Sequence, residues 1–67
     1  MIGYMVTCIA EFARLHGISR REAFRFLREY KAIDFLKENY GIEHTLSIND
    51  AMEDMLIICR NNGGVLG

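Results

Sequence analysis

The fold of this chain is decided by the stretch Ile33-Asp34-Phe35-Leu36-Lys37-Glu38-Asn39-Tyr40-Gly41-Ile42-Glu43-His44-Thr45-Leu46-Ser47. Its first half carries apolar residues at helical spacing and predicts a short amphipathic helix that ends at Gly41. A polar turn with His44 and Thr45 follows, and Ser47 is suited to cap the next helix. The stretch therefore predicts helix, turn and helix, which is typical of an all-α protein.

Working outward, the same signals predict a compact bundle of four short helices, at about 2–16, 20–31, 32–40 and 47–62. Gly17 ends the first helix, and Ser19 with Glu22 forms a capping box for the second. The apolar stripe changes phase near Lys31, so a bend or break is favoured there, but the pattern leaves open whether helices two and three are continuous. We expect one domain, residues 1–64, with a short C-terminal tail, residues 65–67.

Apolar periodicity assigns each helix an inward face. For the four helices in turn, the residues expected inward are Ile2, Met5, Val6, Ile9, Phe12 and Ala13; Ala23, Phe24, Leu27 and Tyr30; Ile33, Leu36 and Tyr40, with Phe35 beside them; and Ile48, Ala51, Met52, Met55, Ile58 and Cys59. Phe26 and Tyr4 are surplus to these faces, which favours docking of a partner or a second copy.

Composition excludes several classes of protein. The chain has 67 residues, of which 51% are hydrophobic and 25% charged, so it can fold but has a small core. The longest apolar run, Met55 to Cys59, is far too short to cross a bilayer, and the N-terminus lacks the basic leader of a secretory signal. Cys8 and Cys59 are expected as reduced, buried thiols in a cytoplasmic protein, with a disulfide as the minority alternative.

The two halves of the chain differ in charge. Residues 1–32 hold six basic and three acidic side chains, and residues 33–67 hold two basic and six acidic ones. Arg21, Arg25 and Arg28 share one face of the second helix. Three interpretations remain open: a solvated or internally paired face, an acidic partner protein, or nucleic acid. The internal partners would be Asp50, Glu53 and Asp54.

Tests for chemistry are negative at the level of sequence. Cys8 and His16 lie about 12 Å apart along one helix, too far to share a zinc ion. Both cysteines fall on or beside apolar faces, which argues against a nucleophile. The chain has no phosphate-binding loop or dinucleotide fingerprint and little volume for a pocket. We therefore expect neither an enzyme nor a metal or cofactor site.

The turn around His44 has two main interpretations. In the structural one, Thr45 or Ser47 caps helix amides, and the imidazole bonds a carbonyl or packs on Tyr40. In the functional one, Tyr40, Glu43, His44 and Thr45 form a partner-contact surface, because aromatic residues are enriched at interfaces. A catalytic histidine is the remaining alternative.

The chain resembles a small bacterial family that is catalogued only as a domain of unknown function. The resemblance covers nearly the whole chain, and its most specific part is Ile33-Asp34-Phe35, Tyr40 and His44-Thr45. The other matching residues are Tyr4, Met5, Val6, Cys8, Ile9, Glu11 and Ile18-Ser19. Where the pattern has a leucine before His-Thr, this chain has Glu43.

The resemblance implies a short cytoplasmic bacterial protein, sometimes encoded beside genes that look like ADP-ribosyltransferase-type toxins, and by association an antitoxin-like or accessory role. It carries no catalytic residues. Residues and resemblance together predict a non-enzymatic, self-associating module that binds a protein, not a membrane. The expected contacts are Tyr40, Glu43, His44, Thr45, Arg21, Arg25 and Arg28. The alternative is nucleic-acid binding through the three arginines.

Overall fold

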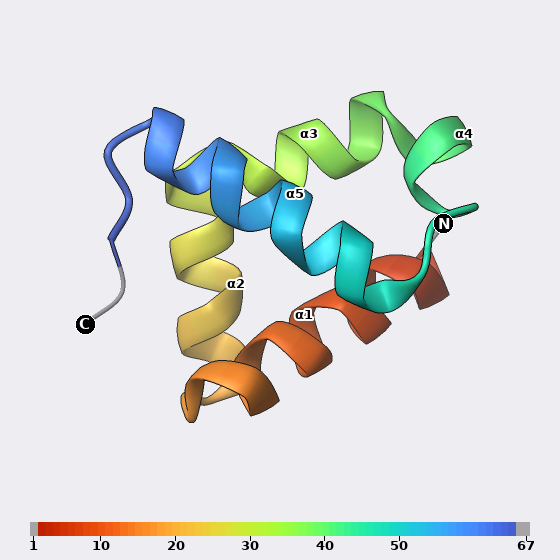
Figure 1. The fold of residues 1–67 in the computed structure, drawn as a ribbon. Coiled ribbons are helices and arrows are strands. Elements are labelled where there is room, and N and C mark those ends of the chain that lie inside the picture. Colours follow the sequence, from red (N-terminus) through yellow and green to blue (C-terminus); the bar gives the residue numbers. More distant parts are fainter. Residues whose placement is uncertain (1, 66–67) are drawn as a thin grey trace.

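The computed structural model describes residues 2–65 of the chain, and the side chains of residues 3–65. Within this range lie α1 (Ile2–His16), α2 (Arg20–Glu29), α3 (Ala32–Glu38), α4 (Tyr40–Glu43) and α5 (Ile48–Asn61). Figure 1 shows α5 running diagonally across the molecule between α1 and α3, with α2 joining them at one side. The predicted all-α bundle is confirmed, with one short helix more than expected.

Local capping signals set several helix ends as predicted. Gly17 takes a left-handed φ of 64° after α1, a conformation that glycine adopts without strain. The Ser19 hydroxyl accepts a hydrogen bond from the Glu22 amide at 3.1 Å, and the Glu22 carboxylate accepts one from the Ser19 amide. Ser47 caps α5 through the Asp50 amide at 3.2 Å. These bonds satisfy amides that the first turn of each helix leaves unpaired.

The break between helices two and three, which the sequence pattern left open, lies at Tyr30 and Lys31. Lys31 has a φ of 72°, so the chain turns through a left-handed residue without using glycine. The second helix therefore ends at Glu29, before the predicted residue 31.

The predicted end of helix three at Gly41 is wrong. Helix α3 stops at Glu38 because Asn39 caps it, with both its side-chain and backbone amides bonded to the Phe35 carbonyl, at 3.0 and 2.9 Å. Asparagine competes in this way with the regular helix bonds. Gly41 then lies inside α4, the extra helix.

The core lies where α1, α2, α3 and α5 meet. Its buried residues are Cys8, Phe12 and Ala13 of α1; Ala23 and Leu27 of α2; Ala32, Ile33 and Leu36 of α3; and Ala51, Met52, Met55 and Cys59 of α5. Most residues of the predicted inward faces are thus buried or pack against the core. The side chain of Ile2, and Leu66 and Gly67 of the predicted tail, lie outside the described residues.

Four predicted orientations are wrong. Val6 is exposed, and Phe24 has 39% of its surface exposed. Phe26 and Tyr4, expected as surplus, pack against the core. Successive residues of a helix are rotated by about 100°, so Phe24 and Phe26 lie about 160° apart on α2 and cannot both face inward. Phe26 takes the inward position because its ring stacks on Phe12, with ring centroids 5.9 Å apart.

Candidate interaction surfaces

The outer face of α2 is basic and surrounds an aromatic ring. Arg20, Arg21, Arg25 and Arg28 are all exposed, and Phe24 is exposed among them. At about 100° per residue, Arg20 and Arg28 lie one turn before and one turn after Phe24 on the same side of the helix. We call these five residues the α2 basic face.

The arginines of this face are free to bind elsewhere. In the described part of the chain the single ion pair is between Arg14 and Glu11 of α1. The internal pairing considered for the α2 arginines, with acidic residues of the last helix, is therefore not present among these residues. Guanidinium groups without an internal ion pair can bind carboxylates or phosphates of a partner in a bidentate manner.

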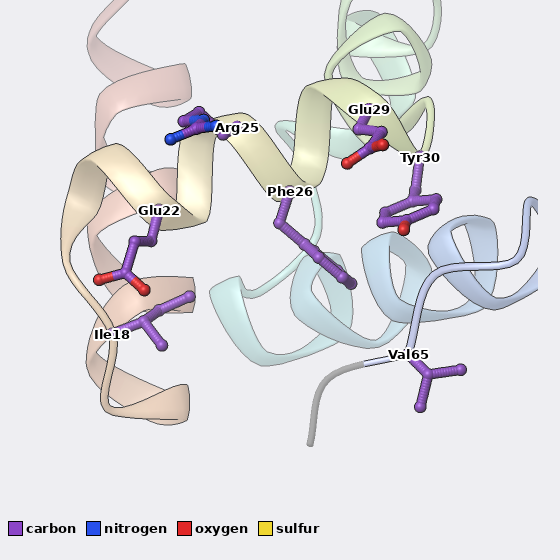
Figure 2. A pocket seen from close by; sticks show the side chains of 7 residues that line it. All are labelled: Ile18, Glu22, Arg25, Phe26, Glu29, Tyr30 and Val65. Carbon is purple, nitrogen blue, oxygen red and sulfur yellow. The ribbon is translucent and has the colours of Figure 1, made fainter.

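The side of α2 that carries Glu22, Arg25 and Glu29 borders a shallow pocket of about 340 Å³, so Arg25 belongs both to the α2 basic face and to this pocket. Figure 2 shows Phe26 and Tyr30 pointing from α2 toward the C-terminal segment that carries Val65. Glu22 and Glu29 lie on its rim, seven residues apart, which separates their backbones by about 10 Å along the helix. The Glu22 carboxylate is already engaged in the capping box. The pocket thus offers an aromatic floor but no close pair of groups for proton transfer.

The predicted surface around His44 is built on α4 and the turn after it. The imidazole stacks on Tyr40 with ring centroids 4.5 Å apart, and its Nδ1 lies 2.6 Å from the Tyr40 carbonyl oxygen. Thr45 donates its hydroxyl to the Ile42 carbonyl at 2.6 Å, so it does not cap an amide. His44 and Thr45 are exposed, and Ile42 of α4 has 67% of its surface exposed. The His44 imidazole thus makes both contacts of the structural interpretation, with a carbonyl and with Tyr40. Its side chain is also exposed, so a partner could contact it.

Glu43 was expected on that surface, but its side chain is buried, with 4% of its surface exposed. Its Oε1 has no hydrogen-bond partner among the described residues. The Tyr4 hydroxyl of α1 donates to the Glu43 backbone carbonyl at 3.0 Å. Burial, together with the neighbouring Asp54 carboxyl of α5, raises the pKa of Glu43 to about 7. The Tyr4–Glu43 bond thereby joins α4 to α1, and the Glu43 carboxyl lies near Asp54 of α5.

The structure separates the two groups of predicted contact residues. In Figure 1, α4 lies beside the start of α1, at the far side of the molecule from α2. Tyr40, His44 and Thr45 therefore form one surface, and Arg21, Arg25 and Arg28 belong to another.

The roles of three residues at these surfaces were not predicted. Phe24 could have been found, because residues at i−4 and i+4 from it are both arginine, which places its ring within the charged face. Ile42 was not singled out because the helix was expected to end at Gly41, which left residue 42 in a turn. Tyr4 had no local signal, since its bond to Glu43 joins residues 39 positions apart.

Cys8 and Cys59 are both free thiols and both buried, as predicted. Burial raises the pKa of Cys59 to about 11, and burial also raises the pKa of Cys8. Both groups therefore stay protonated at neutral pH and are weak nucleophiles. In the described residues no three His, Cys, Asp or Glu side chains converge as metal ligands would. No helix in this part of the chain is both long and apolar enough to span a membrane.

Comparison with known proteins gives one match. The model of a family described as "Protein of unknown function (DUF3791)" matches residues 3–62, which is nearly the whole chain and includes all five helices apart from the first residue of α1. No curated protein and no solved structure matches the chain. The expectation of a family of unknown function is confirmed.

Proposed function

The chain belongs to the DUF3791 family of proteins of unknown function, and we propose that it is a non-enzymatic module that binds a protein with an acidic surface through the α2 basic face. The observation that carries this proposal is the exposure of Phe24, at 39%, among four arginines without ion pairs in the described chain. Aromatic and arginine side chains are the types that contribute most binding energy at interfaces.

The side chains of the α2 basic face indicate which chemical groups a partner would present. Carboxylates of the partner would pair with Arg21, Arg25 and Arg28, while an apolar group would cover the Phe24 ring and exclude water around these pairs. Excluding water strengthens each pair, because the effective dielectric constant falls. An acidic groove or helix with one apolar position therefore fits this face.

The resemblance adds a biological setting to the proposal. We propose that the protein is bacterial and cytoplasmic, and that it acts as an antitoxin-like or accessory partner of a neighbouring gene product. Its two reduced, buried thiols are in keeping with a reducing compartment. The neighbouring gene product is accordingly the first partner to test.

We further propose that the chain self-associates through the α4 surface, consisting of Tyr40, Ile42, His44 and Thr45. Ile42 supports this proposal, since a large exposed apolar side chain beside a stacked aromatic pair can be buried by the same surface of a second copy. Sedimentation equilibrium tests it with Ile42→Ser, which should weaken the dimer. A dimer of unchanged strength would refute this use of the α4 surface.

The main proposal is tested by measuring the affinity of the purified neighbouring gene product for the wild type and three variants. Phe24→Ala and Arg28→Glu should each weaken binding at least tenfold, which corresponds to about 1.4 kcal/mol. Lys37→Glu is the matched control, because it reverses an exposed charge on α3. Equal affinities of all four proteins would refute the assignment of the α2 basic face.

Nucleic acid is the second candidate ligand for the same face, because an exposed ring among arginines can also stack on a base. This alternative predicts retention on single-stranded DNA or RNA with a steep salt dependence, and loss of retention in Arg25→Glu. Retention at low salt that is insensitive to Arg25→Glu would exclude it.

A further inference from the structure

A buried acid lies at the junction of three helices. Glu43 ends α4 and has 4% of its surface exposed, and its side chain lies near Tyr4 and Cys8 of α1 and Asp54 of α5. Buried carboxyl groups in proteins are normally paired with a cation or fully hydrogen-bonded. Oε1 of Glu43 has neither kind of partner among the described residues.

The groups that interact with this acid are all neutral or acidic. From α1 these are the Tyr4 hydroxyl and the Cys8 thiol, and from α5 it is the Asp54 carboxyl. In the described chain, α3 contributes no charged group that acts on Glu43. Because no cation compensates an anion at this position, ionisation of Glu43 weakens the closed junction.

The junction also holds α4 in place. The Tyr4 hydroxyl bonds the Glu43 carbonyl at 3.0 Å, and the Tyr4 ring packs edge-on against Tyr40 with centroids 5.6 Å apart. Helix α4 spans only Tyr40–Glu43, too few residues to be stable alone. Its position therefore depends on these contacts and on the state of the Glu43 side chain.

We propose that Glu43 is a proton-operated latch: the neutral acid lets α4 rest against α1 and α5, and its ionisation releases α4 together with the surface that carries Ile42 and His44. The ionised carboxylate is fully hydrated only if α4 moves outward, because the Asp54 carboxyl repels it and no cation of the described residues acts on it. The latch would make the α4 surface ordered at mildly acidic pH and mobile above neutrality.

The pH range follows from linkage. Burial raises the pKa of Glu43 from its ordinary value of 4.5 to about 7 in the closed junction, whereas an opened α4 would return it to the ordinary value. Between these two values the closed form holds one proton more than the open form. The opening constant therefore rises by up to about tenfold per pH unit, and it levels off above pH 7.

The latch is tested by amide hydrogen exchange of the intact chain at pH 5, 6, 7 and 8, corrected for the intrinsic pH dependence of exchange. The amides of Glu43 and His44, bonded to the Asn39 and Tyr40 carbonyls, should lose protection at least tenfold between pH 5 and pH 7. The amide of Met55, in the middle of α5, should not change in parallel. In Glu43→Gln the protection of α4 should be independent of pH.

Three results would overturn the proposal. The first is protection of α4 that does not vary with pH in the wild type. The second is an equal loss at Met55, which would mean that the whole domain unfolds and not α4 alone. The third comes from the wild type alone and does not depend on the folding of a variant: the Glu43 side-chain carboxyl, followed by carbon NMR, titrates near 4.5 and not near 7.

Discussion

Replacing Phe24 by alanine tests the orientation of α2, on which the proposed partner surface depends. Burying a phenylalanine completely contributes about 1.5–3 kcal/mol, and Phe24 keeps 39% of its surface in water. The alanine also has a helix propensity better by about 0.5 kcal/mol. The expected loss in the free energy of unfolding is therefore about 1 kcal/mol. For a domain of this size, each kcal/mol lowers the thermal unfolding midpoint by roughly 4–8 °C.

The assay is urea unfolding followed by far-ultraviolet circular dichroism, with Phe12→Ala as the matched control. Phe12 is completely buried, so the same truncation should cost about 3–5 kcal/mol. Because a domain of this length has a total stability of about 3–10 kcal/mol, the control should lose a large part of its free energy of unfolding. A loss of 3 kcal/mol or more in Phe24→Ala would refute the orientation described above. A small loss would allow weakened partner binding by this variant to be interpreted as a lost contact.

Three further predictions concern two glycines, the capping box and the buried acid. Gly64→Ala should destabilise the fold by about 1–3 kcal/mol, since the new Cβ would lie 2.6 Å from the Tyr30 ring. Gly41→Ala should stabilise it by about 0.5–1 kcal/mol, because the new Cβ meets no atom within 4 Å. Thermal melts that rank the two variants in the opposite order would contradict this packing. Ser19→Ala should cost about 1 kcal/mol in urea unfolding through the lost cap, and an unchanged midpoint would show that the hydroxyl bond contributes nothing. For Glu43, whose pKa is raised to about 7, the folded chain binds the extra proton; this stabilisation is complete below pH 4.5, declines as pH rises and is lost by about pH 7. The decline should reach up to about 3 kcal/mol in wild-type urea titrations, and an equally steep decline in Glu43→Gln would assign it to other groups.

Local signals predicted much of the helical framework. The bounds of α1, the capping box at Ser19 and the start of α5 after Ser47 agree with the prediction. Each depends on residues within one helical turn of one another, so the sequence contains the information directly. The choice of Lys31 as the left-handed residue between α2 and α3 could not be predicted, because side chains usually avoid this conformation and glycine normally supplies it.

The candidate sites were predicted in part. That the arginines of α2 share one face follows from their spacing alone, whereas the sequence left open whether this face is exposed or paired within the fold, and the structure leaves it exposed. The grouping of Glu43 with the exposed residues of the His44 turn did not hold, because Glu43 is buried. Its neighbours come from α1 and α5, and no pattern around position 43 indicates residues so distant in the sequence.

Short, capped helices with one basic face follow directly from the amino-acid sequence, since caps, periodicity and charge spacing act between residues close along the chain. Tertiary packing was needed to establish that Phe26 and not Phe24 joins the core, that α4 forms around Gly41, and that Glu43 is enclosed without a cation. These outcomes depend on which surfaces remain to be filled once α1, α3 and α5 have packed, and that competition is settled by contacts between residues far apart in the sequence.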